Sequence, residues 1–238
     1  MKLVSHPAAS RGYANHGWLQ ANYSFSFANF YNPDKLNFGA LRVLNDDLIA
    51  PGMGFGTHPH DNMEIITIPI SGQLKQKDSM GNQWESLKAG EVQLMSAASG
   101  IQHSEINGSK TEHLSLFQIW IIPNKKGGTP SYDQSFFETP TKGVLQVLVS
   151  SVDSTETSGL KIHQDAQISR LHLSAGATFE YALKTTTHGV YVMQVYGSAS
   201  VASQLLVARD AVGIWETAKF EVVAAQDTEL LCIEVPML

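Results

Sequence analysis

The chain has little of several features that commonly define a protein's class. It has one cysteine, Cys232, among 238 residues, so no internal disulfide is possible, which fits a reducing compartment. Charged residues make up 16%, the net charge is -6, and no stretch is rich in Lys or Arg, which argues against a nucleic-acid-binding face. No run approaches the roughly 20 apolar residues that cross a bilayer, and residues 1–6 lack the apolar core of a secretory signal. We therefore predict a cytoplasmic protein that binds neither nucleic acid nor a membrane.

Amphipathic helical periodicity is also missing from the first half of the chain. Short apolar runs recur instead, separated by turn residues, and this pattern is typical of a β-sandwich or barrel. Phe25 and Phe27 flank Ser26, an alternation that predicts a strand near the start. The fold class is therefore predicted to be all-β, with further strands expected at residues 41–44, 64–70, 74–77, 83–85, 91–95, 114–122, 144–149, 171–173, 190–196, 205–208, 220–223 and 230–235.

The chain has a weak internal repeat. Residues 87–95 and 207–215 share a polarity pattern, which indicates that the two halves are copies of one barrel. Residues 124–142 hold two adjacent glycines and two prolines and are the best candidate for a linker between them. The second half has no closely spaced pair of metal-binding side chains. Its isolated histidines are predicted to be structural or surface residues: His163, His172 and His188.

Two short runs carry candidate metal ligands at a spacing of two residues. Side chains alternate faces along an extended strand, so His58 and His60 point to the same side. The same holds for His103 and Glu105 in the second run. If the two strands lie side by side, three imidazoles and one carboxylate converge, which suits a divalent first-row metal with open coordination positions. Each pair taken alone also fits a chance alternation, and strand parity points Glu64 inward as well, so a second carboxylate competes as ligand.

These residues match known motifs. The first motif of the cupin family, G(X)5HXH(X)3E, fits Gly52, His58, His60 and Glu64, and the end of the second motif, GXXHXXXN, fits Gly100, His103 and Asn107. The chain resembles the pirin family more closely, which consists of bicupin proteins and includes bacterial quercetin 2,3-dioxygenases. The residues that carry this resemblance are 16–19, 57–60, 77–82, 103–105 and 118–124, with a looser match at 162–166.

The resemblance implies two tandem jelly-roll cupin barrels. Residues 1–132 would form a metal-binding barrel, and residues 133–238 a barrel without metal ligands. In pirins the carboxylate ligand comes from the HXE pair, which implies that Glu105 is the ligand and leaves Glu64 as a neighbour that holds an imidazole. The implied ligand set is therefore His58, His60, His103 and Glu105, with iron(II) favoured over manganese, nickel, cobalt, copper or zinc.

The resemblance also implies an activity. A quercetin 2,3-dioxygenase opens the heterocyclic ring of a flavonol with dioxygen and releases carbon monoxide, and Glu105 would act as the base that takes the substrate's 3-hydroxyl proton. Two alternatives remain open. Some pirins are regarded as regulators that bind partner proteins, with the metal in a structural or redox-sensing role. The enzyme class could also hold with another enol or a catechol-like compound as the substrate.

Overall fold

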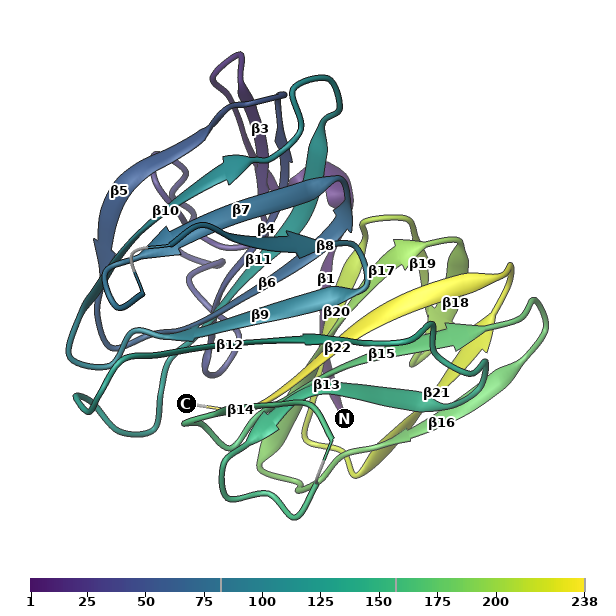
Figure 1. Cartoon of the computed structure of the whole chain (residues 1–238). Coiled ribbons are helices and arrows are strands. Elements are labelled where there is room, and N and C mark those ends of the chain that lie inside the picture. The colour runs from purple at the N-terminus through teal and green to yellow at the C-terminus, as the bar shows by residue number, and fades with distance from the viewer. Residues whose placement is uncertain (82, 157, 238) are drawn as a thin grey trace.

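The computed structural model describes residues 1–81, 83–156 and 158–237, and the regular secondary structure of these residues is almost wholly β-strand (Figure 1). The all-β prediction is confirmed. Helical structure in the described part is confined to one short 3-10 turn, η1 (Ala8–Ser10), and no helix there is long and apolar enough to cross a membrane. Asn82, which belongs to a segment that carries the family resemblance, lies outside the described residues.

The first barrel is built from two sheets. The seven-stranded sheet has the order β12 (Ser131–Phe136), β9 (Glu91–Ser96), β6 (Glu64–Ser71), β11 (Leu114–Ile121), β4 (Leu41–Ile49), β3 (Leu19–Tyr23) and β2 (Gly12–Asn15). The four-stranded sheet has the order β5 (Gly54–His60), β10 (Ile101–Asn107), β7 (Gln73–Asp78) and β8 (Glu85–Lys88).

The second barrel repeats this plan. Its seven-stranded sheet has the order β1 (Lys2–His6), β20 (Ala211–Trp215), β17 (His188–Tyr196), β22 (Thr228–Pro236), β15 (Gln167–Leu173), β13 (Leu145–Ser151) and β14 (Leu160–Ile162). Its four-stranded sheet has the order β16 (Thr178–Ala182), β21 (Lys219–Ala224), β18 (Ser198–Val201) and β19 (Gln204–Val207). The order β5-β10-β7-β8 thus recurs as β16-β21-β18-β19, and β9-β6-β11-β4 recurs as β20-β17-β22-β15. The predicted duplication is confirmed.

Two glycines at equivalent turns show the same duplication at residue level. Gly72 follows β6 with φ 84°, and Gly197 follows β17 with φ 76°. A Cβ on either residue would lie within 2.7 Å of a backbone carbonyl oxygen, of His113 and Asp227 respectively. Only glycine fits both the left-handed backbone and this close approach.

The second barrel takes one edge strand from the start of the chain, and one edge strand of the first barrel comes from the predicted linker. Strand β1 pairs with β20 of the second barrel, and β12 pairs with β9 of the first. The predicted linker, residues 124–142, therefore contains a strand, and the boundary expected between residues 132 and 133 falls inside β12. The division into residues 1–132 and 133–238 stays a prediction.

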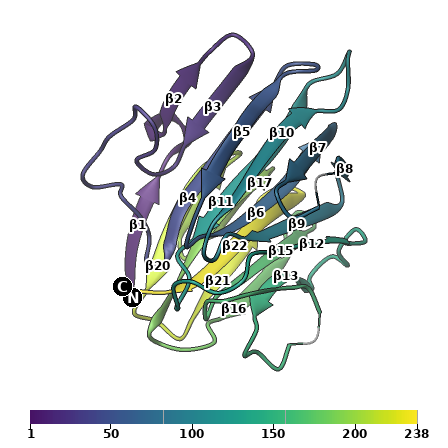
Figure 2. The same ribbon diagram turned by 60° about the vertical axis from the view of Figure 1, so that its left-hand side comes forward.

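The two seven-stranded sheets pack against each other and enclose the largest apolar core (Figure 2). Strand β11 contributes to both sides of its sheet, as the long apolar run predicts. Leu114 and Leu116 point into the first barrel, whereas Phe117 and Ile119 point to the second. A strand that is buried on both faces carries apolar side chains on both, and this explains why the run is long and mostly apolar.

Strand β4 also alternates between the barrel interior and the interface. Leu44 and Asp46 face the second barrel, and Asn45 and Asp47 face inward. The Asp46 carboxylate lies 3.0 Å from Nε of Arg209, which belongs to the second barrel, and 3.1 Å from a terminal guanidinium nitrogen of Arg11. Two cations on one carboxylate thus join the barrels at the back of β4.

The strand predicted around Ser26 is wrong. Strand β3 ends at Tyr23, and residues 24–40 form a loop. Ser26 closes this loop because its backbone N–H donates to the carbonyl of Lys35 and its hydroxyl donates to that of Asn32. Phe25 and Phe27 are buried for different reasons: Phe25 joins the core between the barrels, and Phe27 packs against the first barrel's own core.

We expect the substitution Asp46→Asn to destabilise the protein by about 3 kcal/mol, because two largely buried guanidinium groups would lose their anion. Urea unfolding measures the effect. The matched control is Glu180→Gln, which breaks a pair with Lys219 whose side chains are about 60% exposed and which should cost less than about 1 kcal/mol. Equal losses of stability for the two variants would contradict the structural importance of Asp46.

Candidate metal centre

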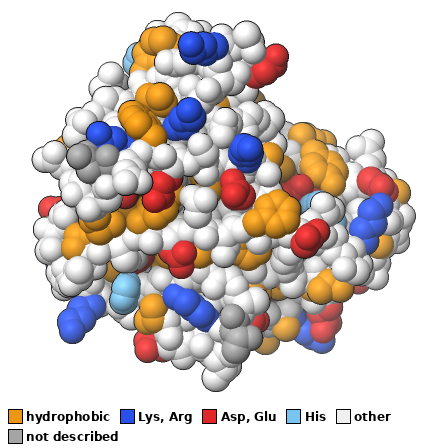
Figure 3. All heavy atoms as spheres, in the orientation of Figure 1, with side chains coloured by type: hydrophobic (Ala, Val, Ile, Leu, Met, Phe, Trp, Pro, Cys, Tyr) orange, Lys and Arg blue, Asp and Glu red, His pale blue; other side chains and the backbone are white. Residues whose placement is uncertain are grey.

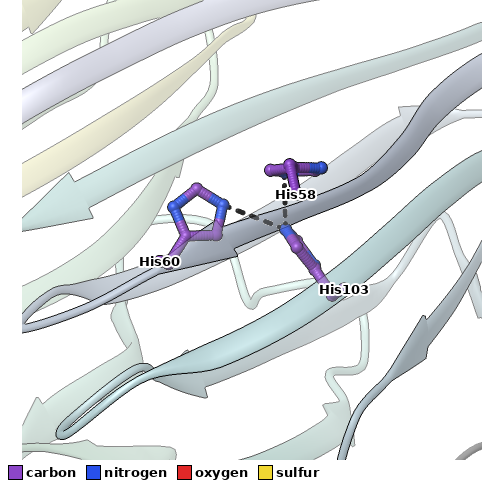
Figure 4. Close-up of side chains that lie close together, drawn as sticks. All are labelled: His58, His60 and His103. Atoms are coloured by element: carbon purple, nitrogen blue, oxygen red, sulfur yellow. Dashed lines mark hydrogen bonds between the residues drawn. The ribbon is translucent and has the colours of Figure 1, made fainter.

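Strands β5 and β10 pair side by side, as the ligand prediction requires. His103 lies directly opposite His58 in the antiparallel register, and residues opposite each other share a face of the sheet. His60, two residues on from His58, joins them on that face (Figure 4). The Nε2 atom of His103 lies 2.9 Å from Nε2 of His58 and 3.1 Å from Nε2 of His60. The predicted convergence of three imidazoles is therefore present.

The local backbone explains this placement. His103 faces His58, but Glu105, two residues on, faces Phe55, three residues back in β5. Strand β5 thus carries one extra residue, and such a bulge re-aims side chains at a barrel rim. A Cβ at Gly54 would lie 2.0 Å from the carbonyl oxygen of Glu105, so glycine is required where the two strands meet. Strand β5 is an edge strand, which accommodates Pro59, as the sequence indicates.

The three imidazoles present lone pairs to one another. Nδ1 of His58 lies 2.8 Å from the carbonyl oxygen of Gly56, which only accepts, so Nδ1 carries the proton and Nε2 is free to bind a cation. Burial and the neighbouring His58 lower the pKa of His60 to about 4. Burial, followed by the charges of His58 and His60, lowers the pKa of His103 to about 3. Both rings are therefore neutral at neutral pH.

This donor set fits a divalent metal. Neighbouring nitrogens bound at about 2.1 Å and at right angles around one ion lie about 3.0 Å apart. The separations of 2.9 and 3.1 Å match that spacing. Lone pairs at these distances repel unless a cation or a shared proton lies between them, and a bound cation satisfies all three nitrogens at once. Within the described residues, this trio forms the one group whose possible ligand atoms all lie within 4.8 Å of one another.

Glu105 lies in the same cavity but outside that trio. Its side chain is buried, and Nε2 of Gln118 donates to its Oε2 at 3.3 Å. Gln118 is itself held by Trp120, whose indole N–H donates to it at 2.9 Å. The Oε1 atom of Glu105 has no hydrogen-bond partner among the described residues, and burial raises the pKa of this carboxyl to about 7, against the hydrogen bond from Gln118. Its role as fourth ligand stays a prediction.

Glu64 lies elsewhere, so the structure differs from the parity argument. Its Oε2 accepts a hydrogen bond from the Ser96 hydroxyl at 2.5 Å, and its Oε1 lies 3.2 Å from Nδ1 of His163. The parity argument fails because β5 ends at His60 and the chain turns through Asn62, at φ 46°, before β6 begins. The imidazole that Glu64 holds is therefore that of His163, a predicted structural histidine from the second half.

A cavity of about 450 Å³ lies between the two sheets of the first barrel and reaches the histidines. Its walls are mainly aromatic, and His60 also borders a shallower hollow of about 610 Å³ at the barrel rim. Proximity in the sequence to the candidate ligands makes Met53, Phe55, Met63, Met95 and Trp120 candidates for a pocket wall, although core packing is the commoner role of such residues. Of the five, Phe55 and Trp120 line the cavity and the other three do not. Sequence reasoning missed residues from β3, β4 and the loop after β3, because no motif marks them. The lining comprises His16, Trp18, Leu19, Ala21, Tyr23, Phe27, Ala28, Asn45, Asp47, Phe55, His58, His60, Glu105, Gln118 and Trp120.

The second barrel fills the equivalent position with rings. Its strands β16 and β21 correspond to β5 and β10 in the shared topology. Tyr181 of β16 lies opposite Phe220 of β21, and the two rings stack with centroids 5.0 Å apart and planes 9° from parallel. Both belong to that barrel's apolar core. The ring pair thus lies between the two strands that correspond to the ligand strands of the first barrel, and the lack of a metal site in the second barrel stays a prediction.

Two jelly-roll barrels of one topology, with converging imidazoles in the first and an apolar core in the second, define a bicupin protein. The chain belongs to the pirin family. The Pirin family model matches residues 5–121, and the model of the quercetinase C-terminal cupin domain matches residues 148–235.

Relatives match over the whole chain. Quercetin 2,3-dioxygenase of Escherichia coli (strain K12) is 42% identical over 229 residues, which cover 96% of each protein. A pirin-like protein of Caulobacter vibrioides is 41% identical over 228 residues, 96% of this chain and 97% of that protein. The crystal structure of the bacterial pirin YhhW from Escherichia coli, in complex with nickel(II), superposes with a TM-score of 0.93 at 38% identity and full coverage of both chains.

We expect the purified wild-type protein to bind one divalent metal per chain and His58→Ala to bind none, because the central trio would lose a ligand. Metal content after dialysis measures this. Glu105→Ala should bind metal more weakly than wild type, whereas Glu64→Ala should retain it, since Glu64 contacts Ser96 and His163 instead. His113→Ala, at an exposed histidine, is the control. Loss of metal in Glu64→Ala but not in Glu105→Ala would overturn the assignment.

Proposed function

We propose that this protein is a metal-dependent dioxygenase that cleaves the heterocyclic ring of flavonols such as quercetin and releases carbon monoxide. The observation that carries the proposal is the histidine trio at the wall of an aromatic cavity, in a chain whose relatives bear the name quercetin 2,3-dioxygenase. His58, His60, His103 and Glu105 are the proposed ligands. Iron(II) is the proposed metal, and manganese, nickel, cobalt, copper and zinc are the alternatives.

The chemistry divides between the metal and the chain. A divalent metal held by the histidines supplies Lewis acidity, which stabilises negative charge on the oxygen that the flavonol presents to it. Glu105 takes the proton of the 3-hydroxyl group, because its Oε1 atom has no competing partner in the described structure and its Oε2 is held by Gln118. The flavonol and dioxygen then yield a depside and carbon monoxide, which accounts for every atom of both reactants.

The cavity walls position the substrate. Trp120 packs edge-on against His60, with ring centroids 4.9 Å apart, and Phe27 packs edge-on against Trp120 at 5.3 Å. Phe55 and Trp18 form a similar pair at 5.1 Å on the other side. Rings held by such contacts have fixed orientations, and they give the cavity mainly aromatic walls. Such walls suit a planar aromatic substrate.

The surface supports a small-molecule substrate over a nucleic acid. On the face drawn in Figure 3, Lys and Arg side chains are scattered among Asp and Glu side chains and do not gather into a basic patch. The net charge of -6 has the same sign as a phosphate backbone. We propose dioxygen and a flavonol or related enol as the reactants, and the cytoplasm as the location.

We expect oxygen uptake and loss of quercetin when the protein is reconstituted with iron(II), and a comparison with the five alternative metals ranks their activities. His58→Ala is the blank, because it removes a ligand and leaves the cavity walls in place. Turnover that disappears in the blank supports the dioxygenase. Tight metal binding without turnover under any metal would refute it, and would favour the pirin-type regulator that acts through protein partners.

We expect Glu105→Gln to lower kcat at least about a hundredfold, because glutamine keeps the shape of the side chain but cannot take a proton. Steady-state oxygen uptake measures kcat, and metal content is measured in parallel so that loss of the ligand is distinguished from loss of the base. Undiminished turnover in a variant that still holds its metal would refute the role of Glu105 as base.

A further inference from the structure

Two polar side chains lie across the cavity from the histidines. Asn45 and Asp47 belong to β4 of the seven-stranded sheet, whereas the histidines belong to the facing four-stranded sheet. Both side chains line the cavity, and both are buried, with exposed fractions of 4% and 6%. A ligand that fills the cavity therefore contacts the histidines at one wall and these two residues at the other.

Both side chains lack partners. Neither Asn45 nor Asp47 forms a side-chain hydrogen bond with another described residue, and the Oδ1 atoms of both are fully buried. Gln118, which faces Asn45 in the register of β11 and β4, shows the contrast, because it both donates and accepts a hydrogen bond. Buried polar atoms in folded proteins almost always have a partner. Two acceptors without one, side by side at a cavity wall, indicate that a ligand supplies the donors.

The surrounding walls sharpen this contrast. Apart from the groups around Glu105, the cavity is lined mainly by rings and aliphatic side chains. Two residues apart on one strand, Asn45 and Asp47 lie about 7 Å from each other along β4, and facing sheets are about 10 Å apart. A planar compound of three rings bridges such a gap, with one oxygen at the histidines and hydroxyl groups at its far end.

We propose that Asn45 and Asp47 accept hydrogen bonds from the hydroxyl groups on the outer rings of the substrate and thereby select polyhydroxylated flavonols over unsubstituted ones. The selection among reacting substrates rests on the proposed function, whereas the binding preference does not depend on turnover. A ring without hydroxyl groups leaves both acceptors buried and unpaired, and this penalty gives the selectivity.

The test uses two substitutions and a matched control. Asp47→Leu and Asn45→Leu replace each polar side chain with an apolar one of similar size, so the cavity keeps its volume. Asp47→Asn keeps an acceptor and should behave as wild type. The control is Thr67→Val, because Thr67 lies in the same sheet, is fully buried, and has a hydroxyl without a partner, yet it does not line the cavity.

The first measurement is the binding of quercetin and of 3-hydroxyflavone, which lacks outer-ring hydroxyls, to metal-free protein by equilibrium dialysis. We expect the ratio of the two dissociation constants to shift about tenfold toward 3-hydroxyflavone in Asp47→Leu and in Asn45→Leu. It should not change in Thr67→Val or Asp47→Asn. An unchanged ratio in both leucine variants, or an equal shift in Thr67→Val, would overturn the proposal.

The second measurement is the ratio of kcat/KM for the same two compounds in metal-loaded protein. We expect it to shift in the same direction in the leucine variants. If the wild type turns over neither compound but Asp47→Leu changes the ratio of dissociation constants, the proposed activity is refuted and the proposed role of Asn45 and Asp47 in selectivity stands. If both compounds react but neither leucine variant changes either ratio, the activity stands and the role of Asn45 and Asp47 in selectivity is refuted.

Discussion

The contact of three imidazole nitrogens at 2.9 and 3.1 Å is the constraint on which the site depends. Neutral imidazole nitrogens at that distance need a cation or a shared proton between them, so the fold must hold the rings close together and neutral. The pairing of β5 with β10 brings the rings together. Burial lowers the pKa values of His60 and His103, so both rings are neutral. The bulge in β5 and the close approach of the strands at Gly54 belong to the same pairing. Without the bulge, another residue of β5 than Phe55 would lie opposite Glu105.

The convergence of the three histidines could be predicted from the sequence because the information for it is local. A spacing of two residues on a strand fixes the direction of both side chains, and a single strand pairing then completes the group. The inference for Glu64 failed because parity holds only within one strand, and the turn at Asn62 separates two. Asn45 and Asp47 could not be found in this way. They look like ordinary polar residues at the end of a short apolar run, and only the packing of the opposite sheet shows that they face the histidines.

The fold shows the same division between local and distant information. The alternation of apolar residues predicts the all-β class, whereas the duplication is predicted mainly by the family resemblance and only weakly by the shared pattern of residues 87–95 and 207–215. The edge strands β1 and β12 could not be predicted in this way, because each forms by pairing with a strand that is distant in the sequence. A segment with Gly and Pro at its ends reads as a linker, although its middle completes a sheet. Strand formation at an edge depends on which backbone groups of a neighbour are unpaired, and composition does not record this.

The first barrel contains the site, and the second barrel supports it from behind β4. Tyr181 and Phe220 stack between the strands of the second barrel that correspond to β5 and β10, and both belong to its apolar core. The second barrel supports the first along β4, where Arg209 pairs with Asp46 and places its guanidinium 5.0 Å from the centre of the Phe117 ring. Alternation along the strand puts Asn45 and Asp47 on the other face, in the cavity. A shift of β4 would therefore displace the interface carboxylate and the back wall of the cavity together. The second barrel thus supports β4, the strand that carries the cavity wall facing the histidines.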